Sequence, residues 1–208
     1  MPDPPPLILA STSPRRHALL AGLGVPFEVL DPAVAEPDPA PGVSGPDYAQ
    51  QMALLKARAA AAQLAAANRP PALILASDTT VDCNGEILGK PADRDDAIRI
   101  LTALSGTTHV VSSAWCLIDA HGAEAVGVDI TRITFRPLER GEIEAYVDTG
   151  ESFGKAGAYA VQEHGDRFVA HIDGEFSTVV GLPLPVVAEL LQARGYRVTL
   201  PGRARPTD

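Results

Sequence analysis

The stretch "PALILASDTTVDCNGEILGKP", residues 71–91, decides the fold class of this chain. Its continuous apolar run from Leu73 to Ser77 is typical of a strand that is buried on both faces of a sheet. Asp78 follows at the expected C-terminal end of this strand, and open α/β sheets bind their ligands at that edge. The dipeptide Asn84-Gly85, between "TTVDC" and "EILG", then predicts a tight β-hairpin.

Upstream, "LILASTSPRR", residues 7–16, predicts a strand that turns directly into a helix. Ser13 is a preferred N-cap residue, and Pro14 suits the first helical position. The unpaired N–H groups and the positive dipole end of a first helical turn favour an anion. Arg15 and Arg16 are unfavourably placed there unless an anion binds them, and a solvated arginine pair on an ordinary cap is the alternative.

The rest of the chain reads as further strands and helices around these two segments. Hydrophobic periodicity predicts helices at about 48–68, at 93–106, at 139–147 and at about 185–194. It also predicts a long hairpin over 107–135 and strands near 161, at 168–172 and at 176–181. Residues 27–47 are expected to form a short strand followed by a Pro-rich acidic loop. Lys56 borders the apolar stripe of the long helix, where the alternative to a site role is a lysine that snorkels to solvent.

Composition and charge exclude several classes of protein. A net charge of −9 over 208 residues argues against a nonspecific nucleic-acid binder, so a phosphate ligand must meet a local cluster of cations. No apolar run approaches the ~18 residues that span a bilayer, and "MPDPPP" lacks the features of a signal peptide. We therefore expect a cytoplasmic protein without a membrane partner. Cys83 and Cys116 are expected to be reduced strand residues.

Two short motifs fail on their context. "GESFG", residues 150–154, matches the pattern of serine hydrolases, but Ser152 follows a predicted helix rather than a strand. "GEILGKP", residues 85–91, resembles part of a phosphate-binding loop but has the wrong glycine spacing and a proline where Ser or Thr should bind magnesium. Neither motif predicts the function.

A set of polar residues at the ends of predicted elements remains. It comprises Ser11, Ser13, Arg15, Arg16, Glu36, Lys56, Asp78, Thr79, Lys90, Lys155 and Gln162. The segments "STSPRR", "LLKARA", "ASDT", "GKP", "LSG", "GKAGAY" and "VVGLPL", in this order, closely resemble the Maf family of nucleoside triphosphate pyrophosphatases. The resemblance covers residues 7–191, and Ser77 and Gly89 are small departures from the family's pattern.

The resemblance implies a fold and a domain plan. Members of the family have an α/β fold of the inosine-triphosphatase type, with a long mixed, strongly bent β-sheet flanked by helices and two lobes around a central cleft. We accordingly expect one Maf-like domain over residues 7–198, between a disordered N-terminal tail at 1–6 and a C-terminal tail at 199–208. The family is also described as cytoplasmic, metal-dependent and often dimeric, which suggests a homodimer.

The resemblance also suggests roles for the polar residues. It implies that Asp78 is the proton acceptor, and hard-cation chemistry makes Glu36 and Asp78 candidate ligands of Mg²⁺ or Mn²⁺. Lys56 and Lys90 would neutralise charge on the reacting phosphates. The remaining phosphate contacts are expected from Ser11, Ser13, Arg16 and Lys155.

Three further residues bear on the base. In the family, the branch associated with thymine and uracil carries residues that match Arg15, Thr79 and Gln162, which predicts hydrolysis of dTTP and UTP to the monophosphate and pyrophosphate. A pyrophosphatase of other specificity, for 7-methyl-GTP or for nucleoside triphosphates in general, is one alternative. A non-enzymatic nucleotide-binding regulator of septum formation is another, although an unpaired carboxylate beside a polyanion would weaken pure binding.

Overall fold

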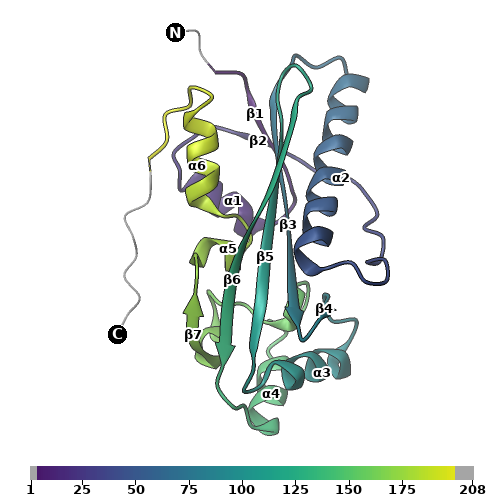
Figure 1. Cartoon of the computed structure of the whole chain (residues 1–208), viewed down its shortest axis with the longest axis vertical. Coiled ribbons are helices and arrows are strands. Elements are labelled where there is room, and N and C mark those ends of the chain that lie inside the picture. Colours follow the sequence, from purple (N-terminus) through teal and green to yellow (C-terminus); the bar gives the residue numbers. More distant parts are fainter. Residues whose placement is uncertain (1–3, 200–208) are drawn as a thin grey trace.

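The protein, as a computed structural model, is described over residues 4–199. In this part of the chain, a mixed β-sheet has the strand order β2-β1-β3-β5-β6-β7, and β4 pairs with β3 beside this path (Figure 1). The strands are β1 (Leu7–Ala10), β2 (Glu28–Leu30), β3 (Leu73–Cys83), β4 (Glu86–Leu88), β5 (Thr108–Ile118), β6 (Glu124–Phe135) and β7 (Val169–Asp173).

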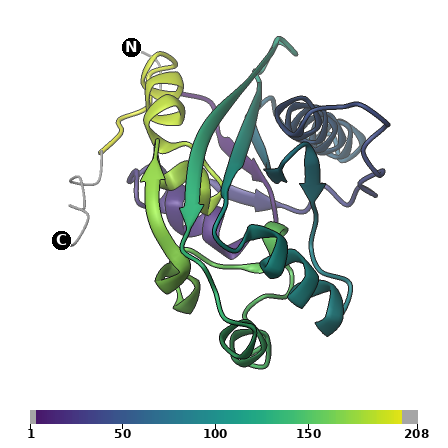
Figure 2. The same ribbon diagram turned by 60° about the horizontal axis from the view of Figure 1, so that its bottom comes forward.

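Helices cover both faces and one end of this sheet. They are α1 (Pro14–Ala21), α2 (Gly45–Ala66), α3 (Arg94–Leu104), α4 (Arg140–Val147), α5 (Phe176–Val180) and α6 (Leu184–Gln192), with short 3-10 segments η1 (Ala156–Ala158) and η2 (His164–Phe168). Seen from the end in Figure 2, α2 lies on the opposite side of the strands from α1 and α6. None of the helices within residues 4–199 is long and apolar enough to cross a membrane.

Strand β3 is buried on both faces, as its apolar run predicts. Leu73 and Leu75 pack with leucines of α1 and α6, whereas Ile74 and Ala76 pack against alanines of α2. The Asn84-Gly85 hairpin is also confirmed, because it joins β3 to β4 and both residues have the positive φ angles, 54° and 83°, of a tight turn. This strand therefore organises one end of the sheet between two helical layers.

The position of Asp78 in its strand differs from the prediction. Asp78 lies inside β3, which continues to Cys83, because antiparallel β5 supplies partners over the whole range from Ile74 to Asp82. The parallel partner β1, however, pairs only as far as Ala76. Between Ala76 and Val81, where β4 begins to pair, this side of β3 has no strand partner, so Asp78 still lies at a local sheet edge where a ligand can approach.

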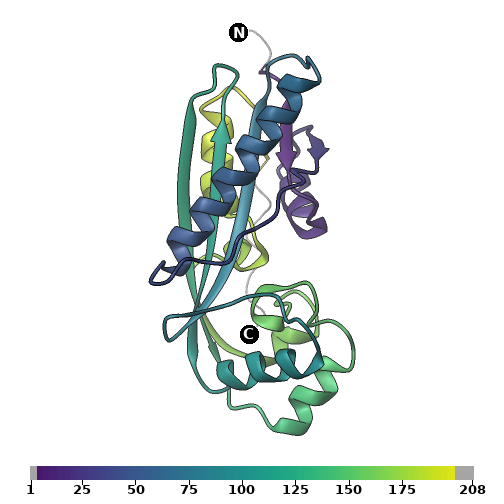
Figure 3. The ribbon, with the colours of Figure 1, turned by 90° about the vertical axis from the view of Figure 1, so that its right-hand side faces the viewer.

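The long strands connect two groups of elements. The first contains α1, α2 and α6, and the second contains α3, α4 and the segments between α4 and β7 (Figure 3). The second group has its own apolar core, in which α3 and α4 pack on the far halves of β3, β5 and β6. The expected α/β fold, with a mixed sheet flanked by helices, is confirmed.

Two predicted strands are wrong. The segment near Val161 forms turns between η1 and η2 instead of a strand, and the apolar run "FSTVVG" forms the short helix α5. The β-branched residues of that run favour a strand, but the Glu175 side chain accepts a hydrogen bond from the backbone N–H of Ser177 and caps a helix. Gly181, with φ at 126°, then ends it.

The cysteines and the expected tails complete the comparison. Cys83 and Cys116 are free and buried in strands, as predicted. The proposed tails at 1–6 and 199–208 fall largely outside the described residues. Two of the described residues in these tails make backbone hydrogen bonds. The carbonyl oxygen of Pro6 accepts from the N–H of Leu73, and the N–H of Thr199 donates to the carbonyl oxygen of Leu23.

Candidate active site

A cleft of about 710 Å³ opens along the free side of β3. All of the polar residues selected from the sequence line it: Ser11, Ser13, Arg15, Arg16, Glu36, Lys56, Asp78, Thr79, Lys90, Lys155 and Gln162. They come from α1, α2, β3 and five connecting segments, so the fold brings together residues that are far apart in the chain. Arginines and lysines gather here although the chain is acidic overall, which is the local cationic cluster that a phosphate ligand requires.

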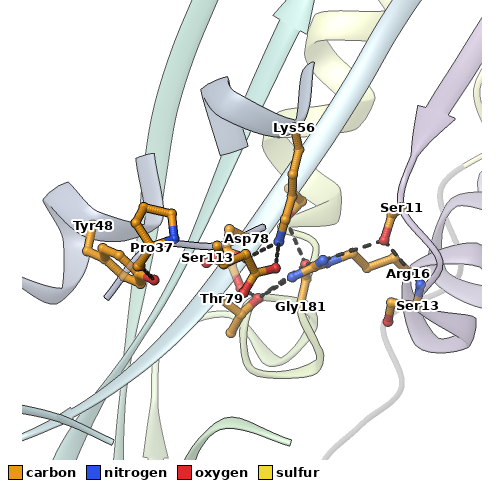
Figure 4. A network of polar contacts seen from close by, with 12 residues as sticks. Ser11, Ser13, Arg16, Pro37, Tyr48, Lys56, Asp78, Thr79, Ser113 and Gly181 are labelled. Carbon is orange, nitrogen blue, oxygen red and sulfur yellow. Dashed lines mark hydrogen bonds and ion pairs between the residues drawn. The ribbon is translucent and has the colours of Figure 1, made fainter. Parts of the chain in front are cut away.

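Lys56 is held between two carboxylates at the centre of the cleft. Its Nζ atom lies 2.5 Å from Oδ1 of Asp78 and 2.7 Å from Oε1 of Glu36, and Figure 4 shows its contact with Asp78. Only 8% of Lys56 and 7% of Asp78 is exposed. The snorkelling alternative for Lys56 is therefore wrong, since its ammonium group points inward to a paired, buried position.

The loop that carries Glu36 is fastened to α2. The hydroxyl of Tyr48 donates to the carbonyl oxygen of Pro37 at 2.7 Å, and the amide of Gln63 donates to the carbonyl oxygen of Asp31 at 3.0 Å. These bonds hold both ends of the segment around Glu36. A Pro-rich loop without secondary structure thereby keeps a carboxylate in contact with Lys56.

Neighbouring cations lower the pKa of the Glu36 carboxyl group. Partial burial alone raises the pKa of this carboxyl, but the hydrogen bond and the charge of Lys56, together with the charges of Lys90 and Arg16, outweigh burial. The pKa of Glu36 is consequently lowered from its usual value. Glu36 is therefore an anion throughout the neutral pH range.

The start of α1 leaves its N–H groups open to the cleft. Ser13 occupies the N-cap position, as predicted, but its hydroxyl makes no capping hydrogen bond within the described part of the chain. Instead, the backbone N–H of Ser13 donates to the hydroxyl of Ser11 at 3.2 Å. The first turn of the helix contains no acidic residue. This turn therefore retains the positive end of the helix dipole for an anion.

Arg16 is anchored by neutral oxygens rather than solvated. Its Nε atom donates to the carbonyl oxygen of Gly181 at 2.9 Å, and Nη2 donates to the hydroxyl of Thr79 at 3.0 Å (Figure 4). Burial lowers the pKa of its guanidinium group, whereas the charge of Asp78 opposes that effect. The alternative of a solvated arginine pair is wrong for Arg16, while the half-buried Arg15 lines the cleft beside it.

The hydroxyl of Thr79 belongs to a chain of hydrogen bonds that reaches α5. It lies 2.8 Å from the hydroxyl of Ser113, which donates to the carbonyl oxygen of Thr178 at 2.6 Å. The hydroxyl of Ser77 donates to the same Gly181 carbonyl that accepts from Arg16. Thr79 is thus engaged with protein groups on two sides, and its position fixes the guanidinium of Arg16.

Three further residues of the cleft, Lys90, Lys155 and Gln162, come from segments between helices and strands. Lys90 follows β4 and is exposed, and Gln162 lies exposed in the turn between η1 and η2. The Nζ atom of Lys155 donates to the carbonyl oxygen of Glu151 at 2.5 Å. All three residues line the same cleft as Lys56, so a bound molecule could contact them together with the Lys56 cluster.

Sequence reasoning missed several residues that build the site. Tyr48 lines the cleft and holds the Glu36 loop, while Ser113 and the Gly181 carbonyl hold Thr79 and Arg16. A backbone carbonyl has no sequence signal, and Ser113 lies on a strand that reads only as part of a hairpin. Two signals were available: Ser77, noted as a departure from the family pattern, whose hydroxyl contacts Gly181, and the segment "VVGLPL", which contains Gly181.

The two rejected motifs are placed as expected. Ser152 is fully buried in a turn, so its hydroxyl is not available as a nucleophile. "GEILGKP" forms β4 and a following loop rather than a loop that opens a helix, although its Lys90 lines the cleft. Neither segment has the structural context that its motif requires.

The pair of carboxylates at Lys56 also suits a divalent cation. Mg²⁺ is commonly bound through one or two carboxylates, with phosphate oxygens of the substrate and water as the other ligands. Nζ of Lys56 occupies the point between Oε1 of Glu36 and Oδ1 of Asp78, so a metal ion would use the remaining lone pairs of these two carboxylates, which are hard oxygen ligands. Residues 4–199 contain no group of three or more His, Cys, Asp or Glu arranged to hold a metal, so substrate oxygens would complete such a site. The donor set fits the ion.

Comparisons with known proteins identify relatives over nearly the whole chain. A relative from Cupriavidus metallidurans, named dTTP/UTP pyrophosphatase, is 47% identical, covering 91% of this chain and 96% of its own. A relative of the same name from Xanthomonas campestris is 46% identical, covering 91% and 98%. The solved structure of a HAM1 protein from Coxiella burnetii has a TM-score of 0.53 at 21% identity, covering 90% of this chain and 98% of that one, and supports the same fold.

A protein-family model covers the region that contains the whole cleft. The model described as Maf-like protein matches residues 6–194, which include every predicted site residue from Ser11 to Gln162. Together with relatives of 46% and 47% identity over nine-tenths of its length, this match shows that the chain belongs to the Maf family.

Proposed function

We propose that this protein is a nucleoside triphosphate pyrophosphatase that hydrolyses dTTP and UTP to the monophosphate and pyrophosphate. The observation that carries the proposal is the Lys56 ammonium, held between Asp78 and Glu36 inside a cleft lined by cations. The names of the relatives at 46% and 47% identity support the same activity. The cleft volume of about 710 Å³ lies in the range of small-molecule sites.

The proposed reaction begins with a water molecule beside Asp78. Lys56 holds Oδ1 of Asp78, which leaves Oδ2 to accept a proton from that water. The water oxygen forms a bond to the α-phosphorus, the bond from this phosphorus to the bridging oxygen breaks, and pyrophosphate leaves with the electron pair. Lys56, fixed by both carboxylates, orients the base and faces the developing negative charge.

The cations around the cleft would bind the rest of the triphosphate. The first turn of α1 offers backbone N–H groups, and Arg16, Lys90 and Lys155 offer positive charge. Glu36 and Asp78 would hold a Mg²⁺ or Mn²⁺ ion, which when bound supplies charge neutralisation and Lewis acidity at the phosphate oxygens. In keeping with the family resemblance, we also infer a cytoplasmic location and a homodimer, with no membrane or nucleic-acid partner.

Selectivity for thymine and uracil is assigned to Arg15, Thr79 and Gln162. A glutamine amide can pair with one carbonyl and the N3–H of either base, but after rotation it also fits cytosine. An arginine only donates, so it favours the carbonyl at position 4 over the amino group of cytosine. Because the Thr79 hydroxyl is already shared with Arg16 and Ser113, we propose that Thr79 contributes indirectly, by fixing Arg16 and with it the first turn of α1 that carries Arg15.

A panel of nucleoside triphosphates tests this function. With Mg²⁺ or Mn²⁺ present, dTTP and UTP should give the highest kcat/KM, and pyrophosphate should appear as the primary product, measured separately from orthophosphate. Removal of the metal by a chelator should abolish turnover. Equal or higher kcat/KM for CTP, a purine triphosphate or 7-methyl-GTP would refute the base selectivity, whereas orthophosphate as the primary product would refute the reaction.

A further inference from the structure

The buried carboxylate of Glu151 collects hydrogen bonds from the loop that carries Gln162. Oε1 accepts from the hydroxyl of Tyr146 at 2.8 Å and from the backbone N–H of Gly165 at 3.2 Å. Oε2 accepts from the backbone N–H of His164 at 3.3 Å and lies 2.9 Å from its Nδ1 atom. Only 7% of the Glu151 side chain is exposed, so these bonds replace its contacts with water.

The same carboxylate closes the loop on itself through Tyr146. The Tyr146 hydroxyl, which donates to Glu151, also accepts from the backbone N–H of Ala160 at 3.1 Å. Ala160 and Gly165 therefore meet at one point, and a Cβ atom built on Gly165 would lie only 2.6 Å from the carbonyl oxygen of Ala160. Gln162 lies between these two fixed residues, at the part of the loop that faces the cleft.

Glu151 also holds a second residue of the cleft through its main chain. Its carbonyl oxygen accepts from Nζ of Lys155 at 2.5 Å, and its own N–H donates to the hydroxyl of Thr149 at 3.2 Å. The side chain thus fixes the segment around Gln162, while the backbone fixes the ammonium of Lys155. One residue outside the cleft lining connects two residues within it.

We propose that Glu151 is a positioning residue that sets base selectivity by holding Gln162, and with it Lys155, at fixed places in the cleft. This inference rests on the proposed function, in which Gln162 reads the base. Neither the sequence pattern nor the relatives' names assign Glu151 a role. It acts through the loop, since the residues that its carboxylate contacts are Tyr146, His164 and Gly165.

The charge of Glu151 is essential to this arrangement. An ionised carboxylate has only acceptors, and here every partner is a donor or can be one. Burial raises the pKa of Glu151, but the hydrogen bonds from His164, Tyr146 and Gly165 outweigh it and lower the pKa from its usual value. A glutamine of the same shape would place an NH₂ group against one pair of donors, which would release part of the loop.

The test compares Glu151→Gln with Glu163→Gln in the full chain. Glu163 is exposed and adjacent to Gln162, so its substitution removes the same charge near the cleft without removing the hydrogen bonds of Glu151. The readout is the ratio of kcat/KM for dTTP to kcat/KM for CTP. Glu151→Gln should lower this ratio about tenfold, mainly through KM for dTTP, while kcat at saturation stays within a few-fold of the unsubstituted protein. Glu163→Gln should leave the ratio unchanged.

Tyr146→Phe and Gln162→Ala complete the experiment. Tyr146→Phe removes the hydrogen bonds that link Glu151 to Ala160, so it should also lower the ratio of kcat/KM for dTTP to kcat/KM for CTP. This variant provides the test if Glu151→Gln fails to fold. If Gln162→Ala loses the preference for dTTP over CTP but Glu151→Gln and Tyr146→Phe retain it, the inference about Glu151 is overturned while the proposed function stands. An unsubstituted protein without preference for dTTP over CTP would overturn the inference together with the proposed selectivity.

Discussion

Nζ of Lys56 lies 2.5 Å from Oδ1 of Asp78, although the two residues are 22 positions apart and both are buried. Lys56 comes from the middle of α2, and Asp78 comes from β3 just beyond the last residue that pairs with β1. This contact joins the helical layer to the open side of the sheet.

Asp78→Asn should keep the fold and lower kcat by roughly 10² to 10⁴, the usual contribution of a positioned general base. The amide has nearly the same shape and can still accept from Lys56, so the melting temperature should change little. Asp82→Asn is the matched control, because Asp82 lies on the same strand outside the cleft lining. Steady-state kinetics checks this, and an Asp78→Asn variant within a few-fold of the unsubstituted kcat would remove Asp78 from the role of base.

Lys56→Ala and Lys90→Ala should differ in stability although both impair hydrolysis. Each removes a cation from the cleft and should lower kcat/KM by about 10² or more. Lys56→Ala also leaves Asp78 and Glu36 facing each other without their shared cation, so its melting temperature should fall. Lys90 is exposed, and its loss should leave the melting temperature unchanged. Unaltered kcat/KM with a lowered melting temperature for Lys56→Ala would make that lysine purely structural.

Arg16→Lys should raise KM for the nucleotide by about 10- to 100-fold, the equivalent of losing one charge-assisted hydrogen bond. A lysine cannot donate from a planar fork to Gly181 and Thr79 together, so the positive charge would leave its fixed place. Arg58→Lys is the control, because Arg58 pairs with Glu124 in an exposed contact outside the cleft lining. An unchanged KM for Arg16→Lys would show that its anchored geometry is irrelevant to binding.

Stability should fall between pH 6.5 and pH 4 because of His109. Burial between Phe135 and Tyr159 lowers the pKa of His109 to about 4, against about 6.5 in the unfolded chain. The unfolded state therefore binds more protons in this window, so this contribution to stability is complete above pH 6.5 and is lost as the pH falls, by about 3 kcal/mol in all.

Urea unfolding of His109→Gln and His121→Gln at several pH values between 4 and 7 checks this sign. His109→Gln should have a smaller loss of unfolding free energy on acidification, because glutamine does not titrate. His121 is exposed, and its substitution should leave the acid-induced loss as large as in the unsubstituted protein. Equal pH dependence in all three proteins would contradict the assignment to His109.

Local sequence signals predicted most of the fold. The Asn84-Gly85 turn and the apolar run of β3 each act within a few residues, and both are found in the structure, as is the helix predicted at 93–106, which forms α3. The segment "FSTVVG" misled because its strand propensity competes with a cap supplied by Glu175 and with packing against distant elements. Strand propensity alone does not decide such a short segment.

The site was predictable as a set of residues but not as an arrangement. Most of the selected cations and carboxylates lie in or next to connecting segments, whereas Lys56 lies in the middle of α2 and Asp78 inside β3, and all of them line one cleft. The burial of Lys56 was not predictable, because it depends on its contact with Glu36. Glu36 lies in a loop that is held in place by hydrogen bonds from Tyr48 and Gln63 of α2. The carbonyl oxygen of Gly181, which accepts from Arg16 and Ser77, carries no side-chain signal at all.

Hydrolysis of dTTP in water enriched in a heavy oxygen isotope tests the central claim most directly. If Asp78 takes the proton from a water that attacks the α-phosphorus, the heavy oxygen will appear in the thymidine monophosphate and not in the pyrophosphate. Mass spectrometry of both products after a single turnover distinguishes the two positions. Heavy oxygen in the pyrophosphate, or in orthophosphate released first, would contradict attack at the α-phosphorus and the placement of the reaction beside Asp78.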